Sequence, residues 1–318
     1  MQAHPDYPTI QVQPSVDPSV NRDLFLTIRR PYFGTSAAAV LFGEHPFMTA
    51  ADYWLEKVAG TQQEETSQMR RGNHLEHGVA MWFAQEMGWE VTKNDNMFVR
   101  GHLAATPDYW TNDLTDLVEI KTTAKIIDDP ERYWIWQVQG QMLCTSATRA
   151  HLVWVDASMD IKNILIEADA DMQAQLWNAS QEFMQGVELE VMADWIEVEA
   201  RHVIAMYPDP VDSIEGGDEG MTLVADYWNN KRIAKHYDEE ATRLRDVIFA
   251  MAGNHESITH DGNEIATLRP RKLAAQFNKR RFKEEHPGLY EDYMGEPMTT
   301  RALNIPKKIK SAIEGATE

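Results

Sequence analysis

The chain has 318 residues, of which 50 are acidic and 30 basic, giving a formal net charge of −20. Its 43% of hydrophobic residues excludes wholesale disorder, and its length suits one large domain or two small ones. A single cysteine excludes a disulfide scaffold, a zinc ribbon and a four-cysteine iron–sulfur cluster. No apolar run is long enough to span a membrane and no secretory signal is recognisable, so we expect a cytoplasmic protein. Taken alone, the acidity argues against nucleic acid as a partner.

The patterns along the chain divide it into four segments. Residues 1–21 are rich in proline and lack a helical period, which predicts an extended N-terminal tail. Helical and strand patterns alternate densely over 22–205, as in a folded core, and 206–222 has the composition of a linker. Residues 223–318 begin with a long helical pattern, followed by an Asp-Gly hairpin signal at 261–262 and a basic arm.

The basic arm stands out against the acidic remainder of the chain. Residues 269–310 hold eleven Lys/Arg and five Asp/Glu, a local charge of +6, so residues 1–268 carry −24. A solvated surface helix would explain this composition. We favour the hypothesis that the arm contacts DNA phosphates or a neighbouring subunit.

The first motif in chain order lies near residue 30. Arg29 and Arg30 precede a glycine turn, after which Thr35 and Ser36 open a helical pattern. Hydroxyl side chains often cap helices, which is one interpretation of this motif. A helix N-terminus beside arginines is also a natural phosphate site, which is the other.

A second helical pattern covers residues 70–83. At about 100° per residue, Glu76 shares a face with Ala80, Phe83 and Met87. A carboxylate on an apolar face needs a partner, because burying a lone charge is costly. A metal ion or a lysine would supply that partner, and a glutamate paired with an arginine at the boundary is the alternative.

Two short strand patterns come next, with Pro-Asp-Tyr around Asp108 and Leu-Val-Glu-Ile-Lys at 117–121. The polar residues 111–116 between them predict a hairpin loop. Side chains alternate along a strand, so Glu119 and Lys121 share one face while their apolar neighbours point into a core. An ordinary strand with a solvated polar face would explain Glu-x-Lys alone, whereas the hairpin also brings Asp108 to the same place.

Two carboxylates and a lysine form the P-D…E-x-K pattern of metal-dependent nucleases. Hard oxygen ligands hold Mg²⁺, and the bound metal activates a water and neutralises developing charge. The lysine orients that water or stabilises the transition state. Downstream, the helical pattern at 133–143 places Trp134, Gln137 and Gln141 on one side, where the amides could position water or phosphate oxygens. A plain polar helix face is the alternative for this last element.

In their order and spacing, these motifs resemble those of the phage λ exonuclease-like, YqaJ-type viral recombinase nucleases of the PD-(D/E)xK superfamily. The similar stretches are residues 34–43, 49–57, 71–76, 106–108, 118–121 and 136–139. The segment 282–290 is also similar to the C-terminal part of phage members. The resemblance implies an α/β (α+β) fold, in which a mixed central β-sheet is flanked by helices and followed by a C-terminal helical and β-hairpin extension.

The resemblance also implies roles for individual residues. Asp108, Glu119 and the backbone carbonyl of Ile120 would bind the catalytic metal, Mg²⁺ or alternatively Mn²⁺. Glu76 would ligate or support a second metal, and Lys121 would position the attacking water. Gln137 would hold the neighbouring network. Ser36, with Arg29 or its neighbour Arg30, would bind a 5′-phosphate. The family often has an acidic residue after the phosphate-binding serine, where this chain has Ala37.

The activity that the resemblance implies is metal-dependent 5′→3′ degradation of linear double-stranded DNA. This degradation leaves 3′ overhangs for phage-type recombination in a bacterial or phage-infected cell. The implied partners are DNA ends, further copies in a trimeric ring, and a single-strand annealing protein. Two alternatives stay open: a repair nuclease or endonuclease without a recombination partner, and a non-catalytic acidic DNA mimic or partner-binding protein. If the nuclease interpretation holds, part of the acidity belongs to the metal site, and the rest limits indiscriminate DNA binding.

Overall fold

The structure is a computed structural model that describes residues 7–16, 20–60, 66–111, 113–207, 209, 212–272, 275–295 and 301–315. It divides into two compact units, Met1–Met206 and Tyr207–Glu318, which are described separately. All four predicted segments lie partly outside the described residues. The residues left out are 1–6 and 17–19 in the tail, 61–65 and 112 in the core, 208, 210 and 211 in the linker, and 273–274, 296–300 and 316–318 in the C-terminal segment with its basic arm.

The centre of the first unit is a five-stranded sheet with the strand order β3-β6-β7-β8-β9. Strands β7 and β8 are parallel and the other neighbours are antiparallel, so the sheet is mixed, as the family resemblance implied. Its strands are β3 (Val91–Lys93), β6 (Tyr109–Thr111), β7 (Leu117–Thr122), β8 (Arg149–Val155) and β9 (Ile161–Glu167).

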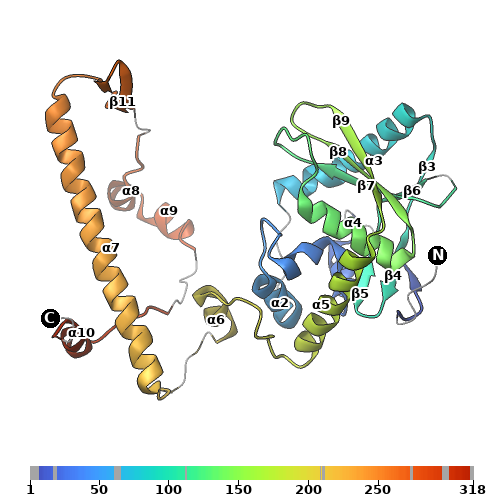
Figure 1. Cartoon of the computed structure of the whole chain (residues 1–318), viewed down its shortest axis with the longest axis horizontal. Helices are drawn as coiled ribbons and strands as arrows, with labels where there is room; N and C mark the ends of the chain where they lie inside the picture. Colours follow the sequence, from blue (N-terminus) through green and yellow to red (C-terminus); the bar gives the residue numbers. More distant parts are fainter. Residues whose placement is uncertain are drawn as a thin grey trace. The chain divides into compact units, whose positions relative to one another are not determined.

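Helices cover both faces of this sheet (Figure 1). On one face, α3 (Ser67–Met87) packs Ala80 and Phe83 against Val118 and Ile120 of β7. On the other face, α4 (Arg132–Thr145) contributes to a core cluster with Leu117 of β7. Because side chains alternate along a strand, the odd-numbered residues of β7 face α4. Glu119 and Lys121 therefore point toward α4.

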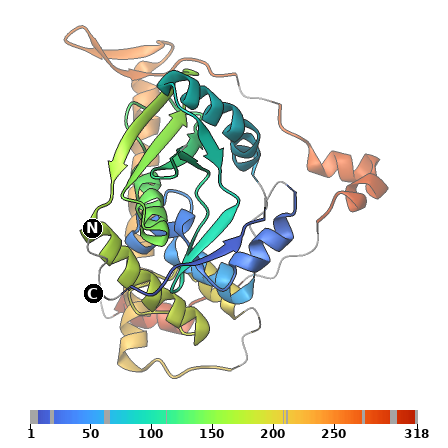
Figure 2. The same cartoon turned by 90° about the vertical axis from the view of Figure 1, so that its right-hand side faces the viewer.

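A second sheet of four strands lies beside the first in the same unit (Figure 2), in the order β1-β4-β5-β2. Its strands are β1 (Gln11–Pro14), β4 (Asn96–Arg100), β5 (Leu103–Ala105) and β2 (Phe33–Gly34). Strand β1 comes from the segment predicted to be an extended tail and pairs with β4. The remaining elements of this unit are α1 (Arg22–Arg29), the 3-10 helix η1 (Thr35–Phe42), α2 (Ala50–Ala59), α5 (Ala170–Glu188) and α6 (Ala200–Met206).

The second unit contains the predicted long helix and hairpin. Helix α7 (Gly217–Ala252) begins inside the segment that the sequence indicated as a linker. Strands β10 (Ser257–His260) and β11 (Asn263–Thr267) pair antiparallel, which confirms the hairpin. Asp261 and Gly262 both have positive φ, 49° and 80°, as a tight Asp-Gly hairpin turn requires. Three short helices follow: α8 (Lys279–Glu285), α9 (Pro287–Asp292) and α10 (Lys307–Gly315).

The basic arm is partly neutralised by its own side chains. In α8, Arg280 pairs with Glu284 at 3.1 Å and Arg281 pairs with Glu285 at 2.8 Å. Lys283 lies over the ring of Tyr290 in α9, 5.1 Å from its centroid. These glutamates are already subtracted in the local charge of +6, so the pairs leave that excess unchanged. Among the described residues, no helix is both long and apolar enough to cross a membrane.

Candidate active site

The hairpin formed by β6 and β7 brings the first carboxylates together. Tyr109 pairs with Val118, so Asp108, one residue earlier, comes level with Glu119 across the two strands. The carboxylate of Asp108 accepts a hydrogen bond from the backbone N–H of Ile120 at 2.8 Å. This bond fixes Asp108 against the strand that carries Glu119 and Lys121.

Glu119 is the centre of a polar network between β7 and α4. Its side chain is only 2% exposed. Lys121 donates to Oε1 of Glu119 at 2.6 Å, Gln137 donates to the same oxygen, and Gln141 donates to Oε2 at 2.7 Å. Lys121 also donates to Oε1 of Gln137 at 2.9 Å. The network thus satisfies a buried carboxylate with one ammonium and two amides, as a buried charge requires.

Sequence reasoning proposed that the amides of both Gln137 and Gln141 position water or phosphate oxygens, and the family resemblance assigned a role to Gln137 alone. The two amides are four residues apart on α4, so they lie on the same side of the helix. That spacing had already placed Gln141 beside Gln137, and only the tertiary contact with Glu119 shows that both donate to one carboxylate.

Burial and the charges of the site shift the pKa values of Asp108 and Lys121. Burial raises the pKa of Asp108 well above its ordinary value, and the negative charges of Glu119 and Glu76 raise it further. Lys121 and the Ile120 N–H act in the opposite direction without reversing the shift. Burial alone would lower the pKa of Lys121, but Glu119 and Asp108 outweigh it and raise that pKa. The lysine is therefore a stable ammonium beside an excess of carboxylates.

The donor set fits a hard divalent cation in type and in charge. Asp108, Glu119 and Glu76 supply carboxylate oxygens, and the raised pKa of Asp108 records negative charge that a cation would compensate. Among the residues that the structure describes, no three His, Cys, Asp or Glu side chains converge closely enough to form a ready metal cluster. Ile120 directs its N–H to Asp108, and a metal-binding role for its carbonyl stays a prediction.

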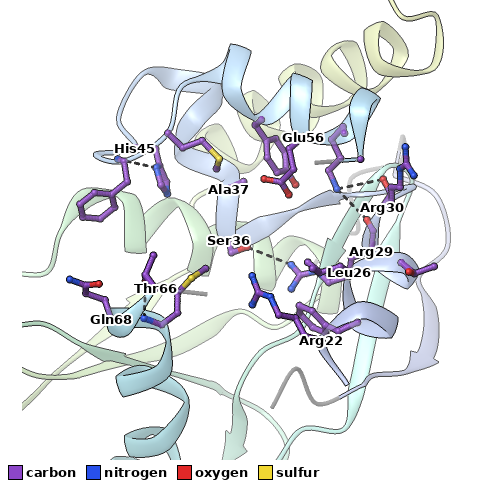
Figure 3. A pocket seen from close by; sticks show the side chains of 18 of the residues that line it. Arg22, Leu26, Arg29, Arg30, Ser36, Ala37, His45, Glu56, Thr66 and Gln68 are labelled. Atoms are coloured by element: carbon purple, nitrogen blue, oxygen red, sulfur yellow. Dashed lines mark hydrogen bonds between the residues drawn. The ribbon is translucent and has the colours of Figure 1, made fainter. Parts of the chain in front are cut away.

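The residues that we predicted to bind a 5′-phosphate line a pocket of about 790 Å³ (Figure 3). Arg29, Arg30, Ser36 and Ala37 all line it, and Arg22 joins them. The guanidinium of Arg29 donates to the hydroxyl of Ser36 at 3.5 Å. A Cβ at position 34 would lie 2.7 Å from Nη2 of Arg29, so any larger residue there would displace the end of that arginine side chain.

The two adjacent arginines have different surroundings. Burial lowers the pKa of Arg29, and the charges of Tyr53, Glu119 and Glu56 partly offset this effect. Arg30 is exposed and donates to the carbonyl of Val58 at 3.3 Å. Arg29 is thus the arginine that is directed to Ser36. The negative charge of Glu119 acts on the Arg29 guanidinium, which lines this pocket.

The backbone that carries both arginines is held by Lys57 of α2, which sequence reasoning missed. Its ammonium donates to the carbonyls of Tyr32 at 2.7 Å and Arg29 at 3.2 Å. Lys57 is 8% exposed, and burial lowers its pKa to about 8. A lysine in an amphipathic helix gave no signal of this role, because its partners lie more than twenty residues away.

The helix-cap interpretation of the Thr35 and Ser36 motif is wrong. The helix that begins at Thr35 is a 3-10 helix whose N-cap is Gly34, and no side chain caps it. Thr35 is buried in the interior, whereas Ser36 is exposed at the pocket. The hydroxyl of Ser36 is therefore turned to the pocket and to Arg29.

Comparisons with known proteins were made against families, curated proteins and solved structures. Residues 24–148 match the family model of the YqaJ-like viral recombinase domain. An alkaline exonuclease from Laribacter hongkongensis is similar in structure, with 23% identity, a TM-score of 0.45, and coverage of 53% of this chain and 93% of that one. A phage-related exonuclease from Haemophilus somnus has 14% identity, a TM-score of 0.42, and coverage of 50% and 96%. No curated protein matches the chain significantly.

Proposed function

We propose that this chain, whose residues 24–148 belong to the YqaJ-like viral recombinase domain family, is a divalent-metal-dependent DNA exonuclease. The observation that carries the proposal is the contact of Lys121 with Glu119 and Gln137 beside the carboxylate of Asp108. A lysine held within a carboxylate cluster has a use in phosphodiester hydrolysis, whereas a non-catalytic DNA mimic has no need of it.

The chemistry follows from the donors that the site offers. Asp108 and Glu119, with Glu76 nearby, would hold Mg²⁺ or Mn²⁺, which lowers the pKa of a bound water and offsets phosphate charge. Lys121 would leave or share its bond to Glu119 to orient the attacking water or to stabilise the additional negative charge of the transition state. Gln137 and Gln141 keep Glu119 fixed while this exchange takes place.

The pocket beside this site supports an enzyme that acts at DNA ends. Arg29 and Ser36 offer a cationic and a hydroxyl donor to a terminal 5′-phosphate. A phosphate held there would fix the position of the first phosphodiester bond relative to Asp108 and Glu119. We propose 5′→3′ polarity on linear duplex on this basis. A trimeric ring and a single-strand annealing partner are proposed from the family resemblance alone.

The proposal predicts that the chain degrades linear duplex and spares covalently closed circles. Purified full-length protein is incubated with each DNA in Mg²⁺, in Mn²⁺ and in EDTA, and released nucleotides are measured. We expect release only from linear DNA and only with a divalent metal, because an exonuclease needs an end. Cleavage of the circle would indicate an endonuclease, and no release from either DNA would favour the binding-protein alternative.

A second prediction separates the two arginines. Arg29→Ala should slow degradation of a 5′-phosphorylated duplex by about 10- to 100-fold, the value of a charge-assisted hydrogen bond to phosphate. The rate on a 5′-hydroxyl duplex should change little, so the preference for phosphate disappears. Arg30→Ala is the matched control, because Arg30 is directed to the carbonyl of Val58. Equal losses in the two variants, or in the two substrates, would contradict a phosphate role for Arg29.

A further inference from the structure

Helix α7 carries a stripe of side chains with the spacing of a coiled coil. Apolar or small residues recur alternately every four and three residues along it, with a single polar exception. In heptad notation, the a positions are Tyr227, Ala234, Ala241 and Ile248, and the d positions are Leu223, Asn230, Tyr237, Leu244 and Met251. A sustained a/d repeat of this kind is typical of helices that pair with another helix.

The stripe has no cover among the described residues of the chain. Leu223, Tyr237 and Met251 are 65%, 67% and 66% exposed, and every other residue of the stripe is exposed as well. Most helical stability in proteins comes from packing of an apolar face, so a 36-residue helix with such an exposed stripe lacks its usual support.

Helix α10, which packs on α7, leaves the stripe open. The indole of Trp228 donates to Glu314 of α10 at 3.2 Å, and Lys310 lies over the same indole, 4.4 Å from its centroid. Trp228 occupies a b position, next to the stripe and not within it. The a and d side chains therefore stay available to another helix.

The charges that flank the stripe favour a particular partner. In a parallel, in-register pair, each g residue meets the e residue five positions later in the other helix. In α7 two of these pairs are opposite in charge, Asp226 with Lys231 and Glu240 with Arg245, whereas the others, such as Ile233 with Asp238, are not ion pairs. Glu240 and Arg245 each form an ion pair within their own helix, with Arg243 and Asp246. Such surface ion pairs contribute little free energy, so exchanging them for contacts with a second helix costs little.

The polar member of the stripe points to the same arrangement. In a parallel, in-register pair, Asn230 meets Asn230 of the second helix, and two amides can hydrogen-bond each other. Shifting or reversing one helix would place that amide against an apolar or small residue, where it loses its partner. A single buried asparagine fixes register in coiled coils in this way.

We infer that α7 is a self-association element: it pairs with α7 of a second copy of this chain as a parallel, in-register coiled coil. This inference is independent of the proposed nuclease function and of any contact made by the first unit. It gives the second unit a role in joining copies of the protein.

Cysteine cross-linking of the full-length chain tests the geometry. The native Cys144 is fully buried, so an introduced thiol is the accessible one. Leu223→Cys and Met251→Cys, prepared separately, should each give disulfide-linked dimers on mild oxidation, because each residue lies opposite its own copy. In an antiparallel pair, an introduced cysteine and its copy in the second helix would lie at opposite ends of the coiled coil, roughly 40 Å apart. Lys235→Cys, at an outward b position, is the control that should not cross-link, and failure of both stripe variants would overturn the inference.

Charge exchange tests the register by a second measurement. Glu240→Arg and Arg245→Glu should each weaken dimerisation by about tenfold in sedimentation experiments, because they turn two attractive contacts into repulsive ones. The double variant should restore the affinity of the original chain. Lys235→Glu is the matched control on the outer face of α7 and should leave it unchanged. Unchanged association in both single variants, or no rescue in the double variant, would contradict parallel pairing.

Discussion

Replacing Asp108 with asparagine should abolish nuclease activity and raise the melting temperature of the metal-free protein. The pKa of Asp108 is raised in the folded chain by burial and by Glu119 and Glu76. Its stabilising contribution is therefore complete below the ordinary pKa of an aspartate and is lost as the pH rises through the folded value. At neutral pH the ionised carboxylate disfavours folding, and the neutral asparagine removes that cost.

We expect the melting temperature to rise by about 3 °C, since about 1 kcal/mol corresponds to a few degrees in a unit of this size. The difference from the original chain should shrink as the pH falls toward the ordinary pKa of an aspartate, because Asp108 is then protonated in both the folded and the unfolded chain. Activity should fall by roughly 1000-fold or more, because a carboxylate that holds and orients the reacting metal is lost.

Divalent cations supply a matched comparison. Mg²⁺ or Mn²⁺ should raise the melting temperature of the original chain by relieving the same repulsion, and should have little effect on Asp108→Asn. Asp129→Asn, at an exposed position, should behave like the original chain in both measurements. A lower melting temperature for Asp108→Asn would show that the carboxylate stabilises the fold, contrary to this account.

The features of the site that sequence reasoning predicted are those that depend on neighbours in the chain. The period of two along β7 placed Glu119 and Lys121 on one face, and the polar loop after Thr111 predicted the hairpin that aligns Asp108. The Asp-Gly hairpin of the second unit followed from a similarly local signal and is confirmed, whereas the mixed sheet, also confirmed, was implied by the family resemblance.

The features that sequence reasoning missed depend on contacts between distant segments. Lys57 is buried against carbonyls 25 or more residues away, and no local pattern distinguishes it from a surface lysine of an amphipathic helix. The donation from Gln141 to Glu119 likewise depends on how α4 docks against β7. The prediction that a hydroxyl of Thr35 or Ser36 caps the helix is wrong, because the element is a 3-10 helix whose N-cap is Gly34.

Replacing Lys121 with methionine should also abolish activity, but with the opposite effect on stability. Glu119 is almost fully buried and Lys121 is its cationic partner, so the substitution leaves a buried carboxylate with two neutral amides. Removing one member of a buried pair costs about 3 kcal/mol. We therefore expect the melting temperature to fall by about 10 °C. Lys125→Met is the control, since Lys125 pairs with Glu131 at the surface and should contribute little.

The double variant Glu119→Gln with Lys121→Met separates the two consequences. A glutamine at 119 carries no charge and can still bond to Gln137 and Gln141, so most of the lost stability should return. Nuclease activity should stay absent, because both a metal ligand and the water-positioning ammonium are gone. Thermal unfolding and nucleotide release from linear duplex are measured on all three variants. Full activity in Lys121→Met would exclude the lysine from the reaction, and a double variant as unstable as the single one would show that charge burial is not the cause.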